Sequence, residues 1–466
     1  MQIPILSGVY TDGAQDAHTA YPRNLHPVAR QSGVSAGYLR PADGVVPVAT
    51  GPGADRGGML WNGVHYRVSS ESLIMVADDG TIATLGSVGA GGRCVFDYSF
   101  DRLAISSGGR LYYWDGTTLT QVTDPDLGTV VDHVWVDGYH MVTDGEFLAV
   151  TELTDPFSVN HLKYGSSEAD PDPVVALVKI RNEVYAVNRH TVEVFDNVGG
   201  ENFPFARIEG AQAMKGAVGT HACCAYQDTL AMVGSGRNEA PGVYLVSNGQ
   251  AVKISTATID RQLQDLTQSQ LEGVFVEVRS WLDHACLYVH TTTGTMVFDA
   301  EATKQLGQPV WFHLHSGLTD GSEYTASGFV LDGGKWWAGN HITGQIGTMS
   351  DTDSGHWGAP VGWSFQTAML YNASAGAIVN ELRLVAMTGR VFGKDPQIST
   401  SYSLDGGMTW SMEKFTSAGT VGQHMKRIAW IRQGMMRETR IQRFSGDSDA
   451  HISVMRLEAQ IEPLAR

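Results

Sequence analysis

Residues 215–317 carry the clearest fold signal; they read KGAVGTHACCAYQDTLAMVGSG, PGVYLVSNGQAVKISTATI and, after a short helical segment, VFVEVRSWLDHACLYVHTTTGTMVFDAEA and PVWFHLHSG. Apolar runs of strand length alternate with Gly, Asn and Asp turn signals, the pattern of consecutive antiparallel strands. Residues 258–273 depart from it, because their apolar side chains recur at helical spacing and Gly273 is a stop signal. The sequence therefore predicts two β units joined by a helix that carries Ile259, Leu263, Leu266 and Leu271.

The same texture continues on both sides of this stretch. Asx-Gly pairs suit type I′ turns, because both central residues of such turns need positive φ. Paired hairpins give units of roughly 35–45 residues, the length of a four-stranded propeller blade. The pairs begin at Asn62, Asp79, Asp115, Asp137, Asp144, Asn248, Asp320, Asp332 and Asp405. We expect blades to begin near residues 57, 92, 129, 174, 217, 273 and 325.

These units predict an all-β protein with three parts. Residues 51–355 are expected to form a β-propeller of six or seven blades, because radial closure leaves few exposed strand edges. Residues 356–466 contain short strands after a Gly- and Asp-rich linker and predict a smaller β-sandwich or platform domain. Residues 1–50 predict an extended segment that runs over other parts of the protein or over a neighbouring subunit. A β-sandwich or prism array stays open for the larger part, and a disordered tail for residues 1–50.

Composition limits the function. The chain has 466 residues and a net charge of −17, which argues against a general nucleic-acid coat because phosphate binding requires a basic face. The four cysteines include no Cys-x-x-Cys pair and are expected to be reduced and mostly buried. The N-terminal MQIPILSGVYTDG lacks the features of a secretory signal, and no apolar run reaches the length of a membrane span. We expect a soluble protein made in a cytoplasm.

An ordered set of short motifs carries a resemblance to a known family. The set comprises Lys215-Gly216 with Gly219, VYL and GQA at 243–251, ISTA at 254–257 with Ile259, VFD at 297–299, Trp311, SAGYLR at 35–40 with Gly44, and TVEVF at 191–195. In this order the motifs resemble the packaged-DNA stabilisation (tail hub or nozzle) proteins of short-tailed bacteriophages. The likeness covers residues 20–320 unevenly and fades beyond them.

The resemblance implies a structural virion protein of a phage tail, made in the host cytoplasm, with no catalytic activity, no cofactor and no membrane insertion. Family members form a ring, expected to be a homohexamer, below the portal and adaptor. The ring extends the DNA exit channel, helps to retain the packaged double-stranded DNA, and offers attachment for fibres, spikes or a needle. Two alternatives stay open: a carbohydrate-active enzyme of the sialidase-like or depolymerase kind, and a non-viral propeller interaction protein.

One basic strip stands out in this acidic chain. It alternates with apolar residues, which favours a contact surface over bare solvent. It would contact DNA phosphates, or dock on an acidic partner or the acidic propeller, or remain a solvated face. Its members are Lys426, Arg427, Arg432, Arg437, Arg440 and Arg443.

Two further sets of residues are candidates for roles other than catalysis. The sequence SLDGGMTW matches the Asp-box, S-x-D-x-G-x-T-W, which stabilises a hairpin turn through Ser403, Asp405, Gly407, Thr409 and Trp410. The predicted helix projects from the propeller and is our candidate subunit contact, through Ile259, Leu263, Leu266 and Leu271. The pairs His313/His315 and His133/His140 fit ordinary half-buried strands, and we expect no metal site.

Overall fold

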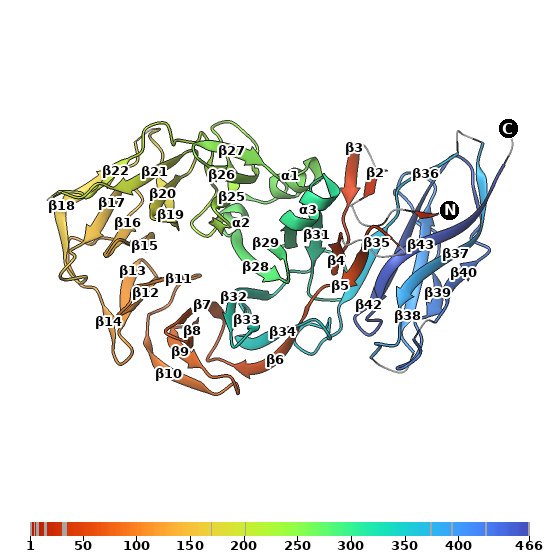
Figure 1. The fold of residues 1–466 in the computed structure, drawn as a ribbon, viewed down its shortest axis with the longest axis horizontal. Helices are drawn as coiled ribbons and strands as arrows, with labels where there is room; N and C mark the ends of the chain where they lie inside the picture. The colour runs from red at the N-terminus through yellow and green to blue at the C-terminus, as the bar shows by residue number, and fades with distance from the viewer. Residues whose placement is uncertain are drawn as a thin grey trace.

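The computed structural model describes residues 1–466 except 1, 4, 6–8, 14–15, 30–34, 169, 201, 373–374, 393–394, 425 and 465–466. It consists of a ring of seven small sheets, six with four strands and one with five, beside a two-sheet sandwich (Figure 1). The prediction of an all-β propeller followed by a smaller β-sandwich is confirmed, and the number of blades is seven.

The first six blades follow one another along the chain. Their strands are β7 (Asp55–Trp61), β8 (Val64–Ser69), β9 (Ser72–Val76) and β10 (Ile82–Ser87); β11 (Val95–Tyr98), β12 (Leu103–Ser107), β13 (Arg110–Trp114) and β14 (Leu119–Gln121); β15 (Asp132–Val136), β16 (Tyr139–Thr143), β17 (Phe147–Thr151) and β18 (Val159–Ser166); β19 (Val174–Ile180), β20 (Glu183–Asn188), β21 (Val192–Asn197) and β22 (Phe205–Arg207); β23 (Gly216–Ala217), β24 (Cys223–Tyr226), β25 (Thr229–Ser235), β26 (Gly242–Ser247) and β27 (Gln250–Lys253); and β28 (Phe275–Trp281), β29 (His284–Thr291), β30 (Gly294–Asp299) and β31 (Trp311–Leu314).

The seventh blade is built from both ends of the propeller sequence. It contains β32 (Ala326–Asp332), β33 (Lys335–Asn340) and β34 (Gln345–Ser350), and its fourth strand is β6 (Gly44–Thr50). Strand β6 pairs antiparallel with β34, with Met349 opposite Val45. Because this pairing joins an early segment to the last blade, it closes the ring with ordinary backbone hydrogen bonds.

The C-terminal domain is a sandwich of two sheets. One sheet has the order β4 (Leu25–Val28), β5 (Tyr38–Pro41), β43 (Ser453–Pro463), β37 (Ala377–Met387) and β40 (Ile428–Ile431), with β1 (Gln2–Ile3) on β43 and β41 (Met435–Met436) on β37. The other has the order β35 (Gly362–Gln366), β42 (Thr439–Asp447), β38 (Gln397–Ser403) and β39 (Lys414–Ser417), with β36 (Leu370–Tyr371) on β42. A separate hairpin pairs β2 (Val9–Gly13) with β3 (Asp16–Ala20).

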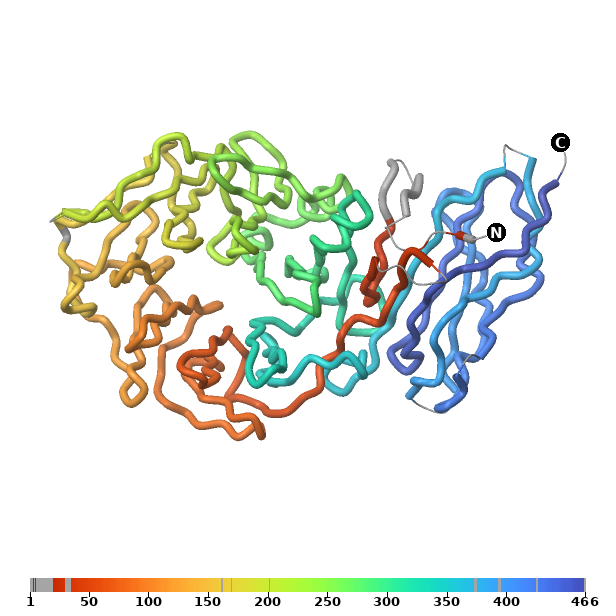
Figure 2. Tube along the Cα trace, in the orientation of Figure 1, coloured from red at the N-terminus to blue at the C-terminus, as the bar shows by residue number. Residues whose placement is uncertain are grey.

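The N-terminal segment therefore contributes to both domains. The hairpin β4–β5 completes a sheet of the sandwich, whereas β6 completes the last blade, and the trace passes directly between the two bodies (Figure 2). Backbone bonds fix the passage, because Arg23 N–H donates to Ser364 O of the sandwich at 2.8 Å and Asn24 N–H donates to His313 O of the propeller at 2.8 Å. The segment joins the two domains rather than lying over one of them.

The Asx-Gly pairs form two kinds of turn. Asn62, Asp137 and Asn248 have φ near +50° and are followed by glycines of positive φ, as a type I′ turn requires. At Asp115 and Asp144 only the glycine has positive φ, and the carboxylate accepts backbone N–H groups of the residues that follow. The expectation of type I′ turns thus holds for part of the set, because an aspartate can close the turn with its side chain.

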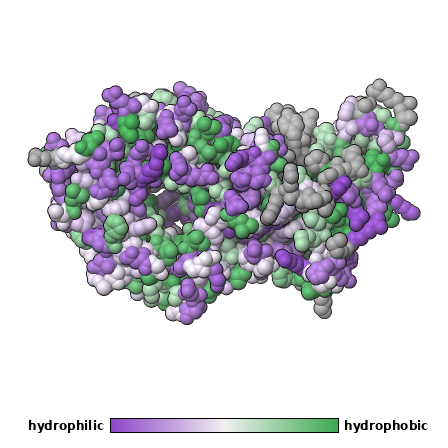
Figure 3. Space-filling model, in the orientation of Figure 1, coloured by the Kyte–Doolittle hydropathy of each residue, from purple (hydrophilic) through white to green (hydrophobic). Residues whose placement is uncertain are grey.

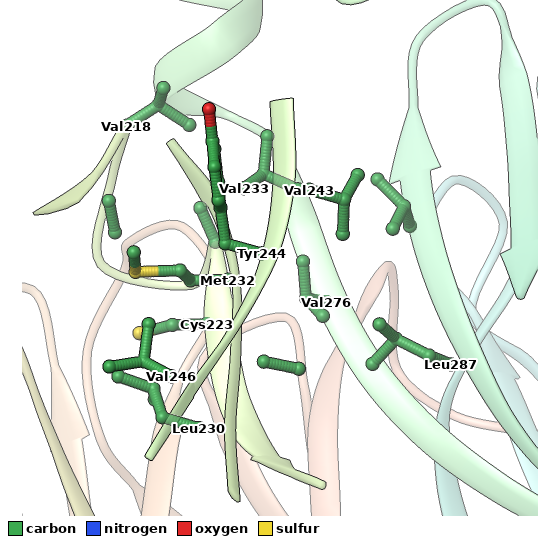
Figure 4. Close-up of a cluster of buried hydrophobic side chains, with 14 of the residues drawn as sticks. Val218, Cys223, Leu230, Met232, Val233, Val243, Tyr244, Val246, Val276 and Leu287 are labelled. Carbon is green, nitrogen blue, oxygen red and sulfur yellow. The ribbon is translucent and has the colours of Figure 1, made fainter. Parts of the chain in front are cut away.

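The hydrophobic core lies between blades rather than in one central mass. The largest cluster joins blades four, five and six, where β24, β25 and β26 pack against β28 and β29 (Figure 4). A second large cluster fills the sandwich between its two sheets, around Trp363, Phe365 and Phe444. Neighbouring blades cover both faces of a blade, so middle strands such as β12, β25 and β30 are buried along nearly their whole length.

Carboxylates on the first strands tie neighbouring blades together. Asp97 accepts Trp135 N–H of the next blade at 2.6 Å, and Asp132 accepts Leu177 N–H at 2.7 Å. Glu277 accepts the N–H groups of Gly328 and Phe329 in blade seven at 3.0 and 2.8 Å. First strands lie around the axis of the ring, where the surface is recessed (Figure 3). These bonds satisfy backbone donors that have no neighbouring strand on that side.

The closing strand provides a direct test of this architecture. Val45 is buried, whereas Val46 on the opposite face of β6 is 38% exposed. We expect Val45→Asp to lower the free energy of unfolding by more than about 3 kcal/mol, because it buries an unpaired charge at the closure. Val46→Asp, the matched control, should change it by less than about 1 kcal/mol. Urea denaturation measures both, and equal effects would contradict a closure that depends on β6.

Candidate functional site

The basic strip is divided between the two sheets of the sandwich. Arg427 and Arg432 flank the edge strand β40, whereas Arg440 and Arg443 lie on β42 of the other sheet. Arg427, Arg432 and Arg437 are exposed, and Lys426 is half-buried with its Nζ donating to Ser417 Oγ at 2.8 Å. Arg427 forms an ion pair with Glu381 of β37. The strip is therefore not one continuous surface.

Arg440 has a structural environment. Its side chain is 1% exposed, and its guanidinium lies 3.9 Å from the ring centroid of Tyr402. It donates to Gln433 O at 2.8 Å and to Gln442 Oε1 at 2.9 and 3.1 Å. Burial lowers the pKa of Arg440 to about 10. Including Arg440 in a contact surface was wrong, because its charge faces the interior of the sandwich. Alternation along a strand shows which residues share a face, but not which of the two faces is buried.

Arg443 is the residue of the basic strip that contacts the Asp-box. Its guanidinium lies 4.2 Å from the ring centroid of Trp410, the last residue of that motif. The motif forms the turn between β38 and β39. Ser403 Oγ donates to Asp405 Oδ1 at 2.6 Å and accepts Gly407 N–H at 2.8 Å. Thr409 N–H donates to Asp405 Oδ1 at 2.9 Å, and these hydrogen bonds lower the pKa of Asp405.

The Asp-box is thus a turn of the sandwich and not part of a propeller blade. Its carboxylate is satisfied by the hydroxyls and amides of its own turn, which is the stabilising arrangement expected for the motif. This location removes the link between the motif and a sialidase-like propeller.

The predicted single helix is two short helices. They are α1 (Ala257–Gln264) and α2 (Gln268–Glu272), separated because Thr267 starts α2 with a capping box to Gln270. The apolar side chains all point inward: Ile259 and Leu263 are 0% exposed, and Leu266 and Leu271 are 8% exposed. They belong to the core cluster of blades four to six. In a folded subunit they are not available to a neighbour, which corrects their proposed role in a subunit contact.

The polar side of these helices borders a groove of about 550 Å³ between the propeller and the sandwich. A third helix, α3 (Ala300–Leu306), connects β30 to β31 and is capped by Asp299. The groove is lined mainly by amides, hydroxyls and rings from α1, β30, β31 and β35. They include Gln262, Thr295, His313, His315, Arg23 and Gln366.

His133 and His140 are buried on β15 and β16, whereas His313 is half-buried on β31 and His315 is buried just after that strand. His315 Nδ1 lies 2.8 Å from Ser322 O, and His133 Nδ1 lies 2.5 Å from Ser106 Oγ. The ring of His140 is tilted against that of Tyr113, with 4.8 Å between ring centroids, and His140 lies diagonally from His133 across the β15–β16 pair. Burial lowers the pKa of His313 and His140 to about 3 and that of His133 to about 4. All three remain neutral near pH 7.

Sequence reasoning missed a buried polar junction between the domains. Arg279 of β28 donates to Asp43 Oδ2 at 2.7 Å and to Tyr288 OH at 3.0 Å. Asp43 also pairs with Arg40 of β5, whose guanidinium lies 3.9 Å from the Trp281 ring centroid. Only the isolated Arg40 and Asp43 beside Gly44 hint at it in the sequence, because their partners lie more than two hundred residues away.

The two-domain architecture indicates the class of protein. The chain is a propeller joined to a sandwich. None of the described helices is long and apolar enough to cross a membrane. This is the organisation of a structural or interaction protein.

The family follows from comparison with known proteins. The family described as bacteriophage P22 Gp10, beta-propeller, matches residues 1–354, and that described as bacteriophage P22 Gp10, beta-sandwich, matches residues 362–462. The chain belongs to the P22 Gp10 family. It is 23% identical over 458 residues to the tail hub protein gp10 of Salmonella phage P22, covering 94% of each chain. It is a structural component of a phage tail, and the suspected resemblance is confirmed.

Solved structures add only distant likenesses. The Neurospora crassa Pan2 WD40 domain gives a TM-score of 0.45 at 10% identity, covering 66% of this chain and 95% of that one. PorZ of Porphyromonas gingivalis gives 0.40 at 10% identity, covering 64% of this chain and 37% of that one. These scores carry no argument about function. The carbohydrate-active alternative receives no support from the family.

Two substitutions separate the structural part of the basic strip from its exposed part. Arg440→Ala should lower the free energy of unfolding by about 2–4 kcal/mol, because it leaves a cavity and unpaired carbonyl groups. Arg437→Ala, an exposed arginine of the same strip, should stay within about 0.5 kcal/mol of the unchanged protein. Urea denaturation measures the free energy of unfolding of both variants. An Arg440→Ala variant as stable as the unchanged protein would show that the hydrogen bonds of Arg440 are dispensable.

The buried histidines predict sensitivity to acid. A histidine with a folded pKa below its unfolded value of about 6.5 binds protons better when unfolded, so stability is lost as the pH falls through 6.5 toward the folded pKa. For His140, with a folded pKa of about 3, the loss between pH 8 and pH 5 is about 2 kcal/mol. His140→Phe should reduce the acid-induced loss by that amount in urea titrations. Substituting the exposed His424 with Gln should leave the loss unchanged; an identical slope in His140→Phe would contradict the assignment.

Proposed function

We propose that the chain assembles into a closed ring of identical subunits, a homohexamer, in the tail hub below the portal and adaptor. The observation that carries the proposal is the match to a tail hub protein across both domains and 94% of the chain. A ring of one protein uses heterologous contacts that close by rotation. The rigid propeller would form the body of each subunit, and the sandwich would make contacts at its side.

The ring would extend the channel through which double-stranded DNA leaves the capsid and help to retain the packaged genome. The net charge of −17 supports a conduit rather than a binding site, because an acidic wall repels phosphates and lets the duplex slide. The outer surface would provide attachment for fibres, spikes or a needle. Its function would be mechanical, without catalysis or a cofactor.

The exposed part of the basic strip is our candidate contact with a partner. Among the described residues, Arg432 and Arg437 form no ion pair, and Ile431 and Met435 beside them are 65% and 46% exposed. Arginine next to exposed apolar side chains is the composition of a protein interface rather than of a sliding DNA contact. The acidic surface of a neighbouring subunit or of the adaptor would complement it.

Assembly of the purified chain tests the ring. We expect mass measurement and electron microscopy to show closed rings, either of the chain alone or on an isolated portal–adaptor complex, with a fixed number of copies per portal. A chain that stays monomeric with that complex and cleaves host polysaccharide would overturn the proposal.

Charge reversal tests the contact surface. Arg432→Glu combined with Arg437→Glu should weaken assembly on the portal–adaptor complex about tenfold or more, because two attractive charges become repulsive. Arg110→Glu combined with Lys335→Glu changes the net charge equally, on exposed positions of the propeller, and should leave assembly within about twofold. Sedimentation of the labelled chain with the complex measures both. Equal losses would indicate a non-specific effect of net charge, and no loss would remove the strip from the interface.

A further inference from the structure

Four side chains with metal-binding atoms converge where the N-terminal hairpin packs on blade six. His26 lies on β4, His284 and Cys286 lie on one face of β29, and Asp299 ends β30 opposite Cys286. All are buried: the side chains of His26, His284 and Asp299 are 6%, 9% and 0% exposed, and Cys286 is 2% exposed as a residue. Figure 1 shows β4 between blade six and the sandwich.

The ligand atoms lie close together. His26 Nε2 is 2.8 Å from Asp299 Oδ2, and His284 Nδ1 is 2.6 Å from the same oxygen. Cys286 Sγ, His26 and Asp299 each offer one atom, and these atoms lie within 4.8 Å of one another. Among the residues that the structure describes, His26, Cys286 and Asp299 are the one group of three or more His, Cys, Asp or Glu close enough to hold an ion, and His284 stands next to this group through Asp299 Oδ2.

The donor set is that of a tetrahedral zinc site. Zn²⁺ takes imidazole nitrogen and carboxylate oxygen at about 2.0–2.2 Å and thiolate sulfur at about 2.3 Å, so ligand atoms around it lie roughly 3.2–3.8 Å apart. The two nitrogens need to move away from Asp299 Oδ2 by well under 1 Å on this estimate. We propose that His26, His284, Cys286 and Asp299 form a structural site for a divalent transition-metal ion, with Zn²⁺ as the best-matched ion.

The surrounding charges are compatible with this ion. Asp299 and the Cys286 thiolate together cancel a double positive charge, so the filled site is neutral. Arg40 and Arg279 lie nearby, and Asp43 pairs with both of them. Neutral filled sites avoid the cost of an uncompensated buried charge. The site therefore does not depend on the arginines.

Coordination changes the proton positions in a defined way. Without the ion each histidine donates its ring N–H to Asp299, and in the bound state that nitrogen is a ligand while its proton moves to the other ring nitrogen. Cys286 loses one proton, because a thiolate is the ligand. Binding thus releases one proton to solvent for each ion, and no redox partner is involved.

The site would clamp the two domains together. His26 belongs to the sandwich sheet through β4, whereas the other three ligands belong to blade six of the propeller. Asp299 Oδ1 already accepts Ala302 N–H at 3.0 Å as the cap of α3, which fixes the direction of its second oxygen. An ion held by both domains adds to the free energy of unfolding, and the added amount grows with the logarithm of the ion concentration divided by its dissociation constant.

Metal titration of the full-length, untagged chain tests the site. After EDTA treatment, Co²⁺ should bind one ion per chain and produce a thiolate-to-cobalt absorption in the near ultraviolet, and Zn²⁺ should displace it. Zn²⁺ at a hundredfold excess over its dissociation constant should raise the melting temperature by about 3 °C.

Matched cysteine variants locate the ligand. Cys286→Ser should abolish the near-ultraviolet band, whereas Cys94→Ser, another buried cysteine located between blades one and two, should retain it. His284→Gln should weaken binding at least tenfold, which keeps the test decisive if Cys286→Ser fails to fold. Absence of binding by the unchanged chain, or an identical band in Cys286→Ser, would overturn the proposal. Both results are independent of ring assembly.

Discussion

The structure depends on one short segment of backbone, residues 22–50, which belongs to both domains. Its first strands complete a sheet of the sandwich, and its last strand completes the seventh blade. A propeller without that strand would expose the edge of β34, and a sandwich without β4 and β5 would expose the edge of β43. Since the same chain satisfies both edges, neither domain can close without fixing the position of the other.

Polar groups at the junction fix the orientation of the propeller relative to the sandwich. Arg279, Asp43 and Arg40 form a buried chain of ion pairs between blade six and the hairpin. Such pairs add little net stability, because their desolvation offsets their attraction, but a misplaced hairpin would leave each charge unpaired. The carboxylates between neighbouring blades also fix relative positions, because each accepts hydrogen bonds from backbone N–H groups of one particular blade.

The division of the basic strip shows how burial decides function among similar residues. Arg437 and Arg440 are three positions apart, yet one side chain is exposed and the other is enclosed by Tyr402, Gln433 and Gln442. Burial and internal bonding also remove two other candidates. The Asp-box carboxylate is hydrogen-bonded within its own turn, and the apolar residues of α1 are packed in the core of the subunit. What is left for partners is the exposed surface of the sandwich edge and the propeller.

Sequence by itself determined the local chemistry: the strand pattern, the blade starts, the Asp-box turn and the ordered motifs that identify the family. These follow from periodicity and turn residues within about forty positions, which a linear reading can measure. Tertiary structure alone decided that there are seven blades, because the closing strand comes from residues 44–50. It also decided which face of each strand or helix is covered, and it brought His26 to Asp299 across more than two hundred residues. Those features depend on contacts between segments that only folding places side by side.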